Sequence, residues 1–131
     1  MIVVDTCAII WDALEPAKLT PKAKKAIAKS DENGELLMCD ISIWEISMLV
    51  KRKRIEVEES PANLIKLILS SRNYSVVSIS PEIAELSVNI ESEINSDPAD
   101  RLIAATSILQ RAPVVTADKN LIQTELLETI W

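Results

Sequence analysis

Short strands that are apolar at every position constrain the fold of this chain more than any other feature of its sequence. Ile2–Val4 and the valines that open the run Val114–Thr116 carry no polar side chain, as expected for strands that helices cover on both faces. Further β-rich runs lie at Leu36–Cys39, Val76–Ile79 and Leu127–Ile130. These runs predict a parallel sheet of four to five strands with helices on either side.

Helix starts recur between these runs. Four of them pair an N-cap residue with proline at the first helical position, at Thr20-Pro21, Ser60-Pro61, Ser80-Pro81 and Asp97-Pro98. A fifth start is expected at Ser42, which with Glu45 has the spacing of a capping box ahead of an apolar stretch. The predicted order is βαβααβααβαβ, an α/β fold in which ligands bind at the carboxyl ends of the strands.

The length of 131 residues corresponds to about one domain, so a single domain over residues 1–131 is expected. Charged residues break every apolar run well below the ~18 residues needed to cross a bilayer. No basic segment precedes the first apolar run, as it would in a signal peptide. We therefore expect a soluble, cytoplasmic protein that does not bind membranes.

Three scarce residue types narrow the chemistry. The chain has no histidine, which excludes Ser-His and Cys-His hydrolases and histidine-ligated zinc. Its single glycine, Gly34, cannot supply a glycine-rich nucleotide-binding loop. Cys7 and Cys39 are too few for a zinc cluster or a disulfide framework. Catalysis, if present, would rest on carboxylates.

Four acidic residues stand apart from the charged surface stretches. Asp5 follows the first predicted strand, Asp118 follows the strand Val114–Thr116, and Glu45 and Asp100 lie in otherwise apolar helical segments. Each has a structural alternative: Asp5 and Asp118 as turn residues or caps, Glu45 as the capping-box partner of Ser42, and Asp100 as a first-turn acid. A parallel sheet brings Asp5, Asp118 and Glu45 to one edge, whereas position alone does not place Asp100.

Carboxylates gathered in a crevice repel one another, and a cation offsets that repulsion. With oxygen ligands only, the preferred ions are Mg²⁺ or Mn²⁺. Such ions activate water and stabilise a leaving oxygen in phosphodiester hydrolysis. The residues thus favour a metal-dependent nuclease.

The sequence resembles the PIN-domain family, and in particular the VapC-type toxins of prokaryotic toxin–antitoxin pairs. The resemblance is carried by four segments in order, Val4-Asp5-Thr6-Cys7-Ala8-Ile9-Ile10-Trp11, Ile41-Ser42-Ile43-Trp44-Glu45-Ile46, Asp97-Pro98-Ala99-Asp100-Arg101-Leu102-Ile103-Ala104-Ala105 and Val115-Thr116-Ala117-Asp118. Each pattern is weak alone, but their order and spacing along the whole chain are specific.

This resemblance implies a three-layer α/β/α sandwich with a central parallel sheet and Mg²⁺-dependent endoribonuclease activity, with Mn²⁺ as a substitute. It implies that Asp5, Glu45, Asp100 and Asp118 form the catalytic and metal-binding quartet, with Thr116 and Thr6 in support. It also implies a homodimer and a VapB-like antitoxin that blocks the site.

Two positions depart from the family pattern. Relatives often carry histidine where this chain has Cys7 and Asn95. Neither position belongs to the acidic quartet, so the departures bear on a substrate contact or on groups around the metal site.

The net charge of −6 argues against indiscriminate nucleic-acid binding. Two Mg²⁺ ions would offset four of these negative charges, and the basic residues are clustered at positions 51–54 and, as Lys22, Lys24, Lys25 and Lys29, in one helix. The structural alternative for positions 51–54 is a solvated helix end. Because only four residues are aromatic, a structured RNA held by its backbone, such as a tRNA, suits the sequence better than a stacked single strand.

Two other functions remain open at this point. A phosphoaspartyl protein of the receiver or haloacid-dehalogenase type would use Asp5 as nucleophile, with a second acid close by and a lysine at the end of a late strand. Here Thr6 and Cys7 follow Asp5, and Lys119 lies three residues after Thr116. A catalytically silent PIN-like binding module would not need all four acids. For a toxin, we expect the antitoxin to insert an arginine or a lysine among the four carboxylates.

Overall fold

The computed structural model describes residues 1–131, with the side chain at position 92 left aside. The chain forms β1 (Ile2–Val4), α1 (Thr6–Leu14), α2 (Pro21–Glu32), β2 (Leu36–Cys39), α3 (Ile41–Lys51), α4 (Pro61–Ser71), β3 (Tyr74–Val77), α5 (Pro81–Asn89), α6 (Pro98–Gln110), β4 (Val114–Val115), α7 (Lys119–Gln123) and β5 (Thr129–Ile130). Two short 3₁₀ turns, η1 (Pro16–Lys18) and η2 (Glu91–Glu93), follow α1 and α5.

All five strands are parallel, in the order β3-β2-β1-β4-β5. Val3 of β1 pairs with Leu37 of β2 on one side and with Val114 of β4 on the other. The first strand of the sequence therefore lies at the centre of the sheet. Its carboxyl end meets those of β2 and β4 at one edge.

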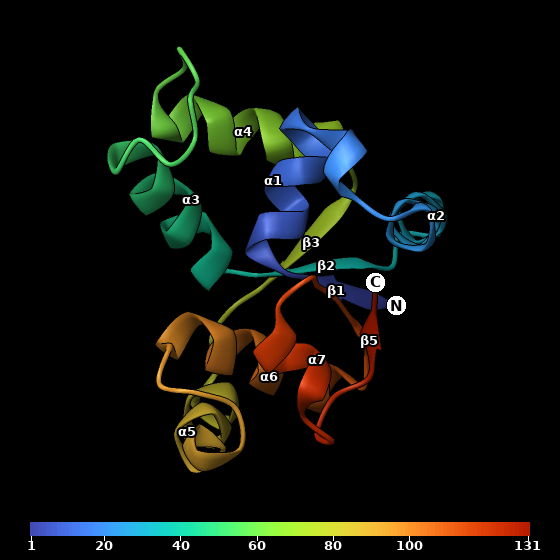
Figure 1. The fold of residues 1–131 in the computed structure, drawn as a ribbon, viewed down its shortest axis with the longest axis vertical. Helices are drawn as coiled ribbons and strands as arrows, with labels where there is room; N and C mark the ends of the chain where they lie inside the picture. Colours follow the sequence, from blue (N-terminus) through green and yellow to red (C-terminus); the bar gives the residue numbers. More distant parts are fainter.

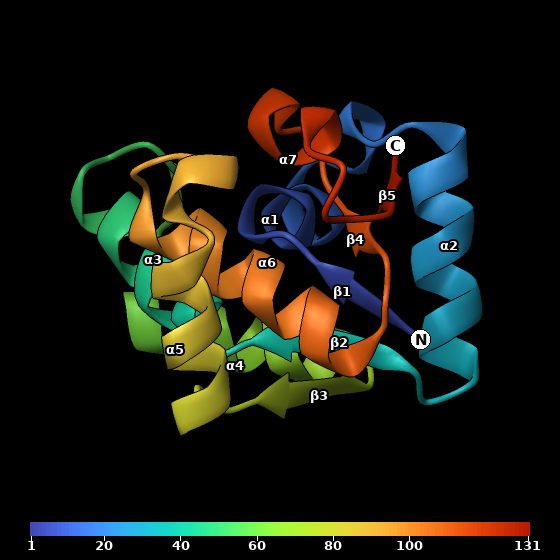
Figure 2. The ribbon, with the colours of Figure 1, turned by 90° about the horizontal axis from the view of Figure 1, so that it is seen from below.

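Alternate side chains of the central strands pack into two separate cores. Ile2 and Val4 join one cluster with residues of α1 to α4, whereas Val3 packs with Ile103 of α6 on the opposite face. Figure 1 shows α1, α3 and α4 on one side of the sheet and α5, α6 and α7 on the other, and Figure 2 shows the same layers from below. The predicted α/β/α sandwich with a parallel sheet is confirmed.

The four proline-marked helix starts are confirmed. The side chains of Thr20, Ser60, Ser80 and Asp97 each accept a hydrogen bond from a backbone N–H in the first turn of α2, α4, α5 and α6. At these positions an oxygen acceptor satisfies an amide that the helix leaves unpaired.

Three details differ from the prediction. Helix α3 begins at Ile41, so Ser42 is a fully buried residue inside the helix and not its N-cap. Helix α1 was not predicted, because its residues continue the apolar run of β1 without a clear polar face. Strands β3 and β5 have other bounds than predicted. Strand β3 runs from Tyr74 to Val77, because these residues pair with β2 and the N–H of Ile79 instead bonds to the Asp40 side chain. Strand β5 begins only at Thr129, because it pairs with no more than Val114 and Val115 of β4.

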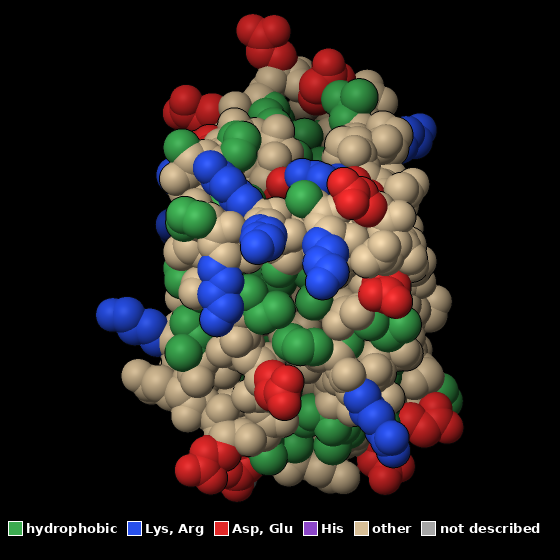
Figure 3. Space-filling model, turned by 90° about the vertical axis from the view of Figure 1, so that its right-hand side faces the viewer, with side chains coloured by type: hydrophobic (Ala, Val, Ile, Leu, Met, Phe, Trp, Pro, Cys, Tyr) green, Lys and Arg blue, Asp and Glu red, His purple; other side chains and the backbone are tan. Residues whose placement is uncertain are grey.

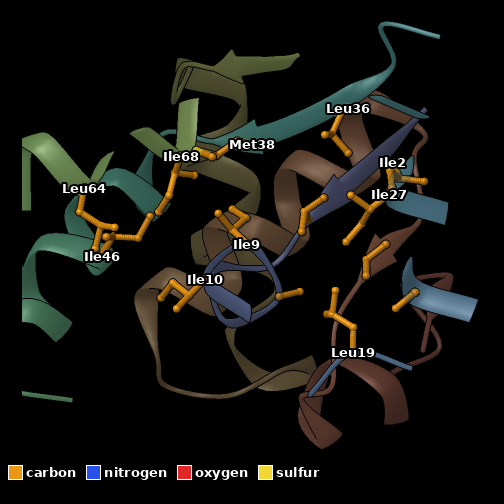
Figure 4. Close-up of a cluster of buried hydrophobic side chains, with 14 residues drawn as sticks. Ile2, Ile9, Ile10, Leu19, Ile27, Leu36, Met38, Ile46, Leu64 and Ile68 are labelled. Atoms are coloured by element: carbon orange, nitrogen blue, oxygen red, sulfur yellow. The ribbon is translucent and has the colours of Figure 1, made fainter. Parts of the chain in front are cut away.

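The larger core cluster lies between the sheet and helices α1 to α4. Figure 4 shows Ile9 of α1, Met38 of β2 and Ile68 of α4 pointing into the same space. Among the described residues, no helix is both long enough and apolar enough to cross a membrane.

Adjacent residues of α4 provide a matched test of this core. Ile68 is 2% exposed and Leu67 is 54% exposed. We expect Ile68→Ala to lower the free energy of unfolding by about 2–5 kcal/mol, because it leaves a cavity. Leu67→Ala should change it by about 0.5 kcal/mol or less. Urea unfolding of both variants measures the difference, and equal losses would contradict this packing.

Candidate active site

Asp5 lies at the point where β1 ends and α1 begins. It is 7% exposed, and both of its carboxylate oxygens accept hydrogen bonds. Oδ1 accepts from the backbone N–H of Thr6 at 2.8 Å, and Oδ2 accepts from the hydroxyl of Thr116 at 2.7 Å. Burial raises the pKa of Asp5, the two hydrogen bonds lower it, and the charges of Asp118 and Asp97 raise it again.

Thr116 connects the ends of two neighbouring strands. Its hydroxyl donates to Asp5 and accepts from the backbone N–H of Asp118 at 3.0 Å. The Asp118 carboxylate in turn caps α7 by accepting from the N–H groups of Asn120 and Leu121. Because the hydroxyl oxygen accepts the hydrogen bond from the Asp118 amide, its single proton is available to donate to Asp5. Thr116 therefore fixes the Asp5 carboxylate relative to the start of α7.

Glu45 reaches the same edge from the second turn of α3. Its Oε1 accepts a hydrogen bond from the Thr6 hydroxyl, whose oxygen also lies 2.8 Å from the Ser42 hydroxyl. Since Thr6 gives its proton to the carboxylate, Ser42 must donate to Thr6. Glu45 is thus held by a chain of two buried hydroxyls and does not cap α3. Burial raises the pKa of Glu45, and the charges of Asp5 and Asp97 add to the rise.

Asp100 lies in the first turn of α6 and is held by Asn95. The Asn95 side-chain N–H₂ donates to Asp100 Oδ2 at 3.0 Å, and its oxygen accepts from the backbone N–H of Asp97 at 2.7 Å. The pKa of Asp100 is raised to about 7, because burial and the charges of Asp97, Asp5 and Asp118 raise it more than the Asn95 hydrogen bond lowers it. Asn95 therefore orients the carboxylate of Asp100, the acid whose place in the fold its sequence position alone did not predict.

The four acids predicted from the sequence lie near enough to Cys7 for their charges to act on its thiol. Desolvation of the sulfur and the charges of Asp5, Glu45, Asp100 and Asp118 together raise the pKa of Cys7 to about 11. Four different elements contribute these carboxylates, and all four lie at the carboxyl edge of the sheet.

The sequence reasoning missed a fifth acid. Asp97 was interpreted only as a helix cap, yet its charge raises the pKa values of Asp5, Glu45 and Asp100. Its spacing of three residues from Asp100 could have shown that both lie on one side of the first turn of α6.

The donor chemistry of this edge fits a hard divalent cation. The side chains offer oxygen ligands, and burial with mutual repulsion disfavours their ionised forms, which a cation would stabilise. As the side chains stand, no three Asp, Glu or Cys groups among the described residues lie close enough together to hold a metal ion. Hydrogen bonds to Thr116, Thr6 and Asn95 instead hold the carboxylates in separate positions.

The sequence was compared with models of known protein families and with characterised proteins. The PIN domain model matches residues 2–126. The chain belongs to the PIN domain family. It is 31% identical over 120 residues to Ribonuclease VapC22 of Mycobacterium tuberculosis, covering 92% of this chain and 88% of that protein.

Two solved structures share the PIN fold of this chain. VapBC2 from Rickettsia felis, bound to a DNA fragment from its promoter, superposes with a TM-score of 0.70 at 17% identity, covering 98% of this chain and 97% of that one. A toxin–antitoxin complex from Klebsiella pneumoniae gives a TM-score of 0.61 at 20% identity, with coverage of 96% and 94%. The resemblance to VapC-type PIN domains expected from the sequence is thereby confirmed.

The raised pKa of Asp100 predicts how stability depends on pH. The folded protein holds this proton more tightly than the unfolded chain does, because the pKa rises from 3.8 to about 7 on folding. This contribution is complete below about pH 4 and is lost as the pH rises through about 7. The metal-free protein should therefore become less stable over this range.

Asp100→Asn tests this dependence, since the amide oxygen can still accept from Asn95. In EDTA at about pH 8 the variant should melt a few degrees higher than the wild type, and the gain should shrink near pH 5. Asp31→Asn should instead lower the melting temperature by a similar amount at both pH values, because hydrogen bonds from Asn73 and Arg72 lower the pKa of Asp31 and keep it ionised throughout this range. Calorimetry at the two pH values measures both effects, and a lower melting temperature for Asp100→Asn at about pH 8 would contradict the repulsion.

Proposed function

We propose that this protein is a divalent-cation-dependent endoribonuclease and the toxin of a VapBC-type pair. One observation carries the proposal: hydrogen bonds through Thr6 and Thr116 link Asp5 to Glu45 and to the amide of Asp118 at the carboxyl edge of a PIN-domain sheet. The charges of these three acids and of Asp100 all act on Cys7 at this edge. Similarity to Ribonuclease VapC22 supports RNA as the substrate class. We further propose that residues 1–131 act as one domain in the cytoplasm.

In this proposal Asp5, Glu45, Asp100 and Asp118 hold Mg²⁺, or Mn²⁺ in its place. When bound, the ion supplies an activated water and stabilises the negative charge of the leaving oxygen. Thr116 keeps the Asp5 carboxylate oriented, and Thr6 does so for Glu45. Because the chain has no histidine, side-chain proton transfer at this edge would depend on the carboxylates.

The two other functions considered from the sequence fit less well. In a phosphoaspartyl protein Asp5 would need a nearby lysine, but among the described residues it makes no ion pair with Lys119. Both Asp5 oxygens also accept hydrogen bonds, which reduces their reactivity as nucleophiles. A silent binding module would have no need for acids whose charges raise the pKa values of Asp5, Glu45 and Asp100.

The proposed substrate is a structured RNA such as a tRNA, held by its backbone. We also propose a homodimer. Trp44, which is 58% exposed beside Glu45, supports an apolar contact between two copies near the site.

Cleavage should depend strictly on divalent cations and on the quartet. EDTA should abolish RNA cleavage, and Mg²⁺ or Mn²⁺ should restore it. Asp5→Asn and Glu45→Gln should each lower kcat by about 10²-fold or more, because each removes a charge that only the site uses. Cleavage of a labelled RNA is followed by gel electrophoresis.

Glu85 provides the matched control for Glu45. It is exposed on α5, so Glu85→Gln removes the same charge by the same chemical change. Glu85→Gln should leave kcat unchanged. Cleavage that persists in EDTA, or full activity in Glu45→Gln, would contradict the proposed site.

We propose that a VapB-like antitoxin inhibits the enzyme by placing an arginine, or less effectively a lysine, among the four carboxylates. A guanidinium can bind two carboxylate oxygens at once where a cation would otherwise lie. The neighbouring apolar side chains of the antitoxin would pack near Trp11 and Trp44. Similarity to toxin–antitoxin complexes supports such a partner.

A peptide from the carboxyl-terminal segment of the antitoxin tests this mode of inhibition. Inhibition should weaken as Mg²⁺ rises and as salt rises, because both compete with the arginine for the carboxylates. Changing the arginine of the peptide to alanine should abolish the competition with Mg²⁺. Equal inhibition by both peptides at every Mg²⁺ concentration would show that the antitoxin acts elsewhere.

A further inference from the structure

A groove of about 810 Å³ opens beside the candidate active site. Cys7 lines it and follows Thr6, whose backbone N–H and hydroxyl bond to Asp5 and Glu45. Trp11 and Lys18 line the side formed by α1 and η1, and Arg52, Lys53 and Arg54 line the side formed by the segment after α3. The groove therefore lies next to the acidic edge and is lined by these three consecutive cations, together with Glu15 and Glu56.

These three cations have no partner within the protein. Among the described residues, Arg52, Lys53 and Arg54 form no ion pair, and their side chains make no hydrogen bond. Lys18, across the groove, is paired with Glu15 at 3.1 Å. In a chain with a net charge of −6, three adjacent unpaired cations produce a local field suited to an anionic ligand.

The backbone holds these cations in a fixed turn. The N–H of Arg54 bonds to the carbonyl of Leu49 at 2.9 Å, and the N–H of Lys53 bonds to the carbonyl of Val50 at 3.1 Å. This pair of bonds is the Schellman ending of a helix, in which the residue after the C-cap is usually glycine. Here that residue is Lys53, with φ of 55°.

A lysine at this position is unfavourable for the backbone. A side chain with a left-handed φ destabilises the folded state relative to glycine. Arg111 ends α6 with a similar φ of 52°, so the strain is common to two helix ends of this chain, and it is the lining of the groove that distinguishes Lys53.

We propose that this groove holds the RNA backbone next to the cleaved bond, with Arg52, Lys53 and Arg54 contacting its phosphates. The inference rests on the proposed ribonuclease function and names the surface that the substrate occupies. RNA is favoured over an acidic peptide because Arg52 of this groove also lines a neighbouring pocket with Glu45 and Asp97, next to carboxylates suited to phosphodiester hydrolysis. The phosphates on one side of the cleaved bond would then lie along the cations.

The second basic cluster of the chain provides a control. Lys22, Lys24, Lys25 and Lys29 lie on α2, and Figure 3 shows basic side chains gathered on the face where α2 lies. Figures 1 and 2 both place α1 between α2 and α3. Removing a charge from α2 thus changes the net charge equally without touching the groove.

Binding of a fluorescein-labelled hairpin RNA in EDTA tests the proposal, because binding is measured without cleavage. Lys53→Gly should raise the melting temperature by about 4 °C, since it relieves the backbone strain. The same variant, and Arg54→Gln, should each weaken RNA binding several-fold and lower the salt dependence of the affinity by about one phosphate contact. Lys25→Gln should leave the affinity unchanged.

Several outcomes would overturn the proposal. The first is that the wild type does not bind the RNA at about 50 mM salt. The second is that Lys25→Gln and Lys53→Gly lose RNA affinity equally. The third is that Lys53→Gly binds RNA normally but loses affinity for the antitoxin peptide. The last result would assign the cations to the antitoxin. Failure of the ribonuclease proposal is recognised separately, by the absence of Mg²⁺-dependent cleavage in the wild type.

Discussion

Repulsion between carboxylates is the constraint to which the rest of the candidate site responds. Parallel strands end at one edge, so Asp5 and Asp118 lie near each other whatever their charges. The protein counters this repulsion with neutral donors: the hydroxyls of Thr116 and Thr6 and the amide of Asn95 each donate to one carboxylate. Neutral donors orient the acids without neutralising them, which leaves their charge available to a cation.

The same constraint explains the distribution of charge over the molecule. The acids at the edge are half-buried or buried, while the cations that could pair with them lie outside, along the groove and on α2. An internal ion pair with Arg52 or Arg54 would block the carboxylates permanently. Because the acidic and basic side chains are kept apart, both remain available to bind other molecules.

The sequence predicted the features that depend on local pattern. Strands that are buried on both faces and helices that begin at proline were found from few residues, because burial and capping act over short distances. Helix α1 was missed because burial on nearly every side removes the polar face by which helices are recognised. The capping box at Ser42 was wrong because the buried hydroxyl found a partner in Thr6, thirty-six residues away in the chain. The bond from Asn95 to Asp100 depends on a turn whose conformation has no periodic signal.

The bond between Thr116 and Asp5 spans 111 residues of the chain and closes the centre of the sheet. Contacts so distant in sequence form slowly, because a long loop must close before any energy is gained. Strand β1 is synthesised first but has neighbours on both sides only after β4 has been made. A partly made chain therefore lacks the complete acidic edge, and the site is assembled only when the last part of the chain has joined the sheet.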